Sequence, residues 1–276
     1  MVQMDGSNHD WLEGRGPKLV LMGWIDDATS RFYGSFHDYE GTLPAMLSLN
    51  GYIQKHGIPK SVYLDKHSTY RNNRLRGGEE GLFKSPQELT QFGRACKQLG
   101  IELIHAHSPQ AKGRIERVFE TLQDRLVKEL RLERARTIQD ANRVLEAYLE
   151  AFNRKFMVEP KGCGDLHRRV RPDTNLREVL SIQNERTVRN DRTILHEQKW
   201  FQIIPQTWAK RAVVYEYWDG KMKIRCGKRF VDYRSIEGPA PRPVPVWPAR
   251  SPRAHAQTIP SRKHPWKRGY KHRAGG

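Results

Sequence analysis

Gln3-Met4-Asp5-Gly6-Ser7 lies at the start of the chain, in a short extended run that carries an acid. Two more acids occupy comparable positions: Asp65 ends the β-branched and apolar run at 61–64, and Glu116 opens a long amphipathic helical pattern. Carboxylates that converge from separate elements repel one another unless a divalent cation lies between them, and their hard oxygen atoms suit Mg²⁺. We therefore predict that Asp5, Asp65 and Glu116 are catalytic metal ligands for phosphoryl transfer on a nucleic acid. The expected cofactor is Mg²⁺ or Mn²⁺, with about two ions at the site.

The order of the expected elements favours an α/β fold in which helices cover both faces of a mixed sheet. Apolar and alternating runs predict five strands, at 2–7, 18–26, 31–37, 61–64 and 101–105. Helical spacing predicts helices at 43–57, 85–99, 113–132 and 137–156. Ser85 is expected as the N-cap of the second helix, with Pro86 at its first position.

Four stretches together resemble the catalytic half of a bacterial insertion-sequence transposase with a retroviral-integrase-type core. They are residues 3–7, 23–31, 63–67 and 108–116. The resemblance implies a ribonuclease H-like, five-stranded mixed sheet with an Asp-Asp-Glu triad. In that fold the first and fourth strands adjoin, so Asp5 and Asp65 can meet, and Glu116 comes from the helix after the fifth strand. It also implies divalent-metal-dependent DNA cleavage and strand transfer by a homo-oligomer on paired DNA ends.

Relatives of this kind carry helix-turn-helix units before the core, whereas Asp5 lies four residues after Met1. We therefore expect an N-terminally truncated transposase. The alternative is a catalytically idle DNA-binding remnant, or an inhibitor of a full-length transposase.

Other acids compete for the first position of the triad. Asp26 and Asp27 end the second expected strand, but in the family pattern they belong to the strand-turn motif before Ser30 and Arg31. Glu120 lies four residues after Glu116 on the same helix face, and we expect it to be exposed.

The chain is strongly basic, with 49 Lys+Arg against 31 Asp+Glu and a formal charge of +18. Such an excess attracts polyanions, and DNA binding releases counterions, although a generic basic protein would carry a similar charge. The expected DNA contacts lie beside the acids, in a basic loop and near the chain end: Lys66, His67, Arg71, Arg74, Lys112, Arg114, Arg117, Lys267 and Arg268.

Composition divides the 276 residues into four parts. We expect the integrase-type core at 1–157, a basic linker that touches DNA at 158–184, a small β-barrel at 185–237 and a disordered tail at 238–276. Trp200, Trp208 and Tyr217 are expected in the barrel core. From residue 239 onward there are eight prolines, nine Lys+Arg and no acid, so this segment cannot bury enough apolar surface to fold alone.

The three cysteines are widely separated and form no Cys-x-x-Cys pair, so neither a disulfide framework nor a zinc ribbon is expected. No stretch approaches the roughly 20 apolar residues of a membrane helix, and no signal peptide is evident. The protein is expected to be cytoplasmic and reduced, with no membrane partner.

Overall fold

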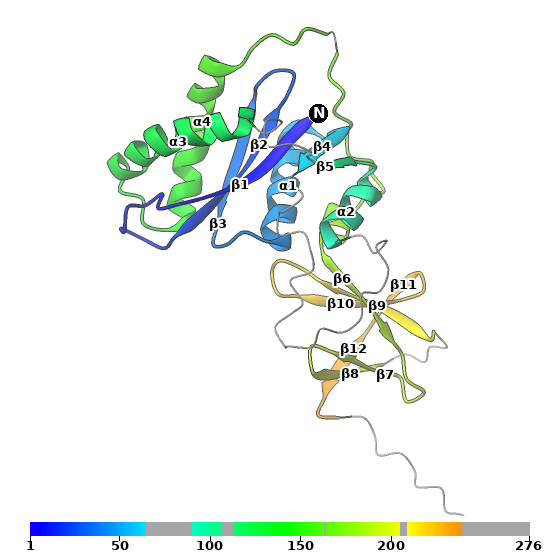
Figure 1. Ribbon diagram of the computed structural model, residues 1–276. Helices are drawn as coiled ribbons and strands as arrows, with labels where there is room; N and C mark the ends of the chain where they lie inside the picture. The colour runs from blue at the N-terminus through cyan, green and yellow to red at the C-terminus, as the bar shows by residue number, and fades with distance from the viewer. Residues whose placement is uncertain (65–89, 106–112, 163, 205–208, 239–276) are drawn as a thin grey trace, which may run out of the picture. The chain divides into compact units, whose positions relative to one another are not determined.

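The computed structural model describes residues 1–64, 90–105, 113–162, 164–204 and 209–238 (Figure 1). Its first five strands form one mixed sheet in the order β3-β2-β1-β4-β5. Their bounds are β1 Val2–His9, β2 Leu19–Asp26, β3 Phe32–His37, β4 Ser61–Leu64 and β5 Glu102–His105. β1, β2 and β3 pair antiparallel, whereas β1–β4 and β4–β5 pair parallel. This order confirms the ribonuclease H-like α/β fold.

Helices cover both faces of this sheet (Figure 1). α1 (Thr42–His56) and α2 (Gln91–Leu99) share one apolar cluster with the sheet, and α3 (Gly113–Leu132) and α4 (Ile138–Phe156) share another. β2 supplies both clusters because successive side chains of a strand point to opposite faces. Met22 and Trp24 belong to the α1 and α2 side, whereas Leu21 and Ile25 belong to the α3 and α4 side.

The helix bounds agree with the sequence pattern except at the start of α2. The N-cap of α2 is Thr90, whose hydroxyl accepts a hydrogen bond from the Gly93 amide at 3.1 Å. The expected N-cap Ser85 was therefore wrong for this helix, because a threonine five residues later satisfies its first amides; Ser85 and Pro86 lie outside the described residues. α4 begins after Thr137 with a reciprocal capping box to Asp140.

The expected linker includes ordered structure packed on the core. Arg168 and Ile58 exchange backbone hydrogen bonds of 2.8 and 2.9 Å. The Arg168 guanidinium donates to the carbonyl oxygens of Leu99 and Gly100, both at 2.8 Å. α5 (Leu176–Val179) follows, and Leu180 is fully buried in the cluster beside α1 and α2. Arg168 therefore anchors this segment to the core, and contact of the segment with DNA stays a prediction.

The strands after α5 form two small sheets in the region where a small β-barrel was expected. One has the order β11-β10-β9-β6 and the other β12-β8-β7. The strands are β6 Ile182–Thr187, β7 Thr193–His196, β8 Lys199–Ile203, β9 Arg211–Glu216, β10 Met222–Cys226, β11 Arg229–Val231 and β12 Tyr233–Ile236. β6 thus begins at Ile182, three residues before the expected start of the barrel at residue 185. Closure into a barrel, and the four domain boundaries, stay predictions.

The core of this region is aliphatic, contrary to the expectation of an aromatic core. Its buried cluster includes Ile194, Ile203, Val214 and Ile224. Trp200 is only half-buried, and the Arg189 guanidinium lies 4.2 Å from the centre of its ring. Tyr217 is buried but lies outside that cluster. Side chains from both small sheets share this cluster, and the rings of Phe201 and Tyr233 pack against it while only partly buried. Trp208 lies outside the described residues.

Across the described ranges, no helix combines the length and apolar character needed to cross a membrane.

Gly23 is a point of close approach between β2 and α3. A Cβ added there would lie 2.7 Å from Cε1 of Phe119 and 2.8 Å from Cζ of Phe32. Because both rings are buried, Gly23→Ala should lower the free energy of unfolding by about 1–3 kcal/mol. Urea titration measures this loss. Gly113→Ala is the matched control, since no described atom lies within 4 Å of its added Cβ. Equal stability of the two variants would contradict the close packing.

Candidate active site

Asp5 lies on the sheet face that α3 covers. It pairs with Gly23 across β1 and β2 and is half-buried. Ser7, two residues later on the same face, accepts a hydrogen bond from the Gln123 side chain of α3 at 3.0 Å. Met4 is buried in the cluster on the opposite face, as strand alternation requires. The carboxylate of Asp5 therefore projects from the same face as the side chain that α3 contacts.

Glu116 lies in the first turn of α3 and is exposed. Phe119 and Gln123, which follow it by three and seven residues, contact Gly23 and Ser7 respectively. Residues at these spacings share one side of a helix, so Glu116 lies on the side of α3 that faces β1 and β2. A carboxylate in the first turn is also favoured by the partial positive charge of the helix N-terminus.

Ionic contacts at both ends fix α3 along β1. At its start, the Arg114 guanidinium donates to the Asp27 carbonyl oxygen at 2.6 Å and lies 3.5 Å from the Asp27 carboxylate. At its end, Arg131 Nε donates to Glu13 Oε2 at 2.8 Å. Hydrogen bonds from Arg131 and then Arg15 lower the pKa of Glu13 to about 2, so this acid stays ionised at neutral pH. The helix that carries Glu116 is thus linked near both of its ends to residues that flank β2.

The competing acids have other partners. Asp26 accepts hydrogen bonds from the Thr29 hydroxyl at 2.6 Å and the Thr29 amide at 3.2 Å, and so closes the turn between β2 and β3. Asp27 receives the Gln3 side-chain amide at 3.4 Å in addition to Arg114. Glu120 is exposed, as expected. Asp26 and Asp27 are therefore engaged in contacts at the C-terminal end of β2.

Of the residues expected to bind DNA, the structure describes only Arg114 and Arg117. Arg114 is held by Asp27, and Arg117 Nε donates to the Gly113 carbonyl oxygen of its own helix at 2.7 Å, although both side chains are exposed. The remaining expected site residues lie outside the described residues: Asp65, Lys66, His67, Arg71, Arg74, Lys112, Lys267 and Arg268. The structure thus brings Asp5 and Glu116 to one side of the sheet, and the catalytic metal-binding role of all three acids stays a prediction.

One further acid and one further cluster of possible metal ligands were not found from the sequence. Glu40, just before α1, lies against β1, because a Cβ at Gly6 would be 2.9 Å from Glu40 Cδ. His196, Glu197 and Glu216 converge in the region of two small sheets. Their irregular spacing matches no metal-binding motif, so only the pairing of the strands reveals them.

Comparison with known proteins supports the resemblance seen in the sequence. No protein-family model matches the chain. It is 37% identical over 248 residues to the "Putative transposase y4bF" of Sinorhizobium fredii (strain NBRC 101917 / NGR234), a match that covers 86% of this chain and 52% of the relative. It is 38% identical over 159 residues to the transposase for insertion sequence IS1202 of Streptococcus pneumoniae, covering 56% of this chain and 32% of the relative. The chain is therefore similar in sequence to these two transposases and spans about half the length of the first.

Two of the solved structures that match the chain are a viral intasome and an integrase catalytic core. The simian T-cell lymphotropic virus intasome, in complex with a PP2A regulatory subunit, matches with a TM-score of 0.44 and 15% identity, over 85% of this chain and 78% of that chain. The HTLV-2 integrase catalytic core in complex with magnesium matches with a TM-score of 0.39 and 16% identity, over 52% and 81%. The fold assignment rests on strand order and direction and not on these distant similarities.

The turn that Asp26 closes can be tested separately from the proposed chemistry. Asp26→Ala removes both hydrogen bonds to Thr29, so the free energy of unfolding should fall by about 1 kcal/mol. Thermal denaturation measures the loss, with Asp173→Ala as the control because that acid is exposed. If the two variants unfolded at the same temperature, Asp26 would be dispensable for the turn.

Proposed function

We propose that this chain is the catalytic region of a DNA transposase, which cleaves DNA and transfers strands with Asp5, Asp65 and Glu116 as its metal ligands. The supporting observation is that Asp5 on β1 and the Glu116 side of α3 share one side of the sheet. Their carboxylates come from elements far apart in the chain, and carboxylate oxygens are the ligands that a hard divalent cation prefers.

The register of the sheet supports Asp65 as the third ligand. β1 and β4 pair parallel, with Val2 opposite Val62 and Gln3 opposite Tyr63. Asp5 follows Gln3 by two residues, and Asp65 follows Tyr63 by two. A register that continued unchanged would set these two acids opposite each other. Because side chains alternate along a strand, both would then project from the α3 face.

The donor set fits Mg²⁺ or Mn²⁺, since carboxylate oxygens suit these ions. The bound ions, about two in number, supply activation of a water or a 3′ hydroxyl and stabilisation of the leaving oxygen. Arg114 and Arg117 in the first turn of α3 supply positive charge for DNA phosphates at the start of a helix. Lys112 precedes this helix in the sequence and is proposed to add to that charge. DNA as substrate and a homo-oligomer on paired DNA ends are proposed from the transposase resemblance.

Carboxylate-to-amide variants test the triad. Glu116→Gln and Asp65→Asn should each abolish Mg²⁺-dependent strand transfer on oligonucleotide ends, because an amide keeps the shape but not the charge that holds the ion. DNA affinity should stay equal or rise, since a negative charge next to phosphate is lost. Glu120→Gln, one helical turn after Glu116 and equally exposed, should retain activity.

Undiminished transfer by Glu116→Gln or Asp65→Asn would refute the site. An inactive unmodified chain that still binds DNA would favour the alternative, a catalytically idle remnant.

The basic chain end is proposed to bind DNA phosphates through Lys267 and Arg268. Double replacement by alanine should flatten the log–log salt dependence of duplex binding by about 0.9 for each lost contact. The matched control is Lys55→Ala with Arg143→Ala, which removes the same charge from cations already near carboxylates, at 2.5 Å from Glu146 and 3.5 Å from Asp140. Identical slopes for the two double variants would show that the chain end does not contact DNA.

A further inference from the structure

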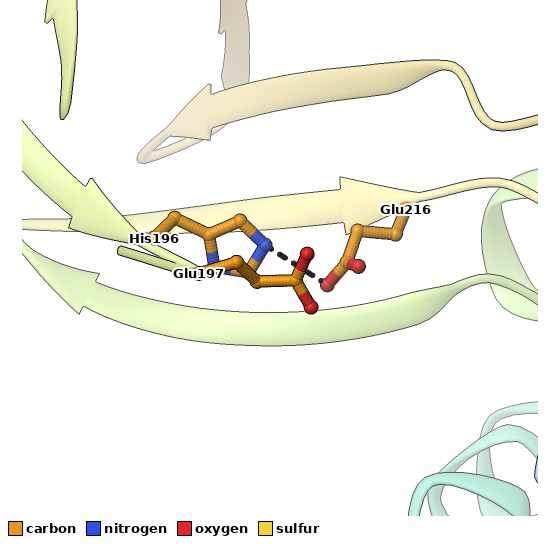
Figure 2. Close-up of side chains that lie close together, drawn as sticks. All are labelled: His196, Glu197 and Glu216. Carbon is orange, nitrogen blue, oxygen red and sulfur yellow. Dashed lines mark ion pairs between the residues drawn. The ribbon is translucent and has the colours of Figure 1, made fainter. Parts of the chain in front are cut away.

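Three potential metal ligands converge in the region of two small sheets (Figure 2). His196 ends β7, Glu197 follows it in the turn to β8, and Glu216 ends β9. One ligand atom of each lies within 4.8 Å of the others. The group shares no residue with the proposed active site, and it joins strands of both small sheets.

His196 is buried without full hydrogen bonding. Its side chain is 3% exposed. Nε2 lies 3.0 Å from Glu216 Oε1 but lacks the alignment of a hydrogen bond, and no described residue hydrogen-bonds to either ring nitrogen. Buried polar groups in proteins nearly always have a partner, because an unpaired one loses its hydration without compensation. A ligand that accepts the lone pair of the imidazole would remove this deficit.

The two carboxylates are positioned around this ring. Glu216 Oε1 accepts a hydrogen bond from the Asn184 side-chain amide at 2.6 Å, which fixes its orientation from the neighbouring strand β6. Glu197 is exposed and occupies a two-residue hairpin turn with Gln198, in which both residues have positive φ, 46° and 62°. Such turns favour Asn and Gly, so glutamate is an unusual choice here. Figure 2 shows the Glu197 carboxylate beside the line that joins His196 to Glu216.

We propose that His196, Glu197 and Glu216 bind a divalent transition-metal ion of the Zn²⁺ type. One imidazole nitrogen and two carboxylate oxygens are ligands of Zn²⁺, and the imidazole favours it over Mg²⁺. Bond lengths of about 2.1 Å at a tetrahedral angle separate two ligand atoms by about 3.4 Å, close to the 3.0 Å between His196 and Glu216. The two carboxylates balance the charge of the ion.

The fourth coordination position opens onto a surface groove of about 970 Å³ that these three residues also line. Lys199, Lys221 and Lys223 line the same groove. Water completes the coordination sphere from this side. The ion would tie the β7–β8 hairpin to β9, and so would stabilise the contact between the two small sheets.

Cobalt tests this site because Co²⁺ substitutes for Zn²⁺ and its visible absorption reports the ligands. The full chain is titrated with Co²⁺ in excess Mg²⁺, and Zn²⁺ is then added to displace it. We expect one bound Co²⁺ per chain at this site. His196→Gln and Glu197→Gln should each weaken its binding at least tenfold. Glu197 is exposed, so its replacement does not endanger folding.

Two controls separate this site from others. Glu185→Gln removes an exposed carboxylate of β6 that pairs with Arg211, and should bind Co²⁺ normally. Glu116→Gln should also bind it normally, which distinguishes this site from the proposed active site. Equal Co²⁺ affinity in the unmodified chain and Glu197→Gln, or loss of the Co²⁺ signal only in Glu116→Gln, would overturn the proposal and leave His196 and Glu216 as a simple ion pair.

Discussion

Close contact between Phe119 and Gly23 is the constraint on which the candidate site depends. Gly23 lies opposite Asp5 in the β1–β2 pairing, and the absence of a side chain there lets the Phe119 ring approach the sheet. One turn earlier on the same helix, Glu116 is carried toward the face from which Asp5 projects. Ion pairs at both ends of α3 then fix its direction along β1. Core packing and site geometry are thus set by the same contact.

Much of this arrangement could be predicted from sequence because it depends on strong periodicities. The bounds of α3 match the expected helix, since its apolar residues recur at helical spacing. The expected strand order is also confirmed. That order came from the family resemblance, because periodicity identifies strands but does not specify which strands pair.

Other features depend on long-range pairing and left little signal in the sequence. Ser85 followed by Pro86 has the pattern of a helix start, yet Thr90 is the N-cap of α2. The segment around Arg168 is irregular in sequence, but its guanidinium and backbone bind the core. The group at His196 becomes visible only when β7 and β9 are placed together. Local composition does not encode such contacts.

The central claim is that Asp5 and Glu116 hold one metal centre together with Asp65. Anomalous diffraction from a crystal of the chain grown with Mn²⁺ tests it most directly, because the method locates the ion without reference to activity. We expect an anomalous peak contacted by carboxylate oxygens of all three acids, and its loss in Asp5→Asn. A fully occupied Mn²⁺ elsewhere, with Asp5 and Glu116 free of the ion, would contradict the account.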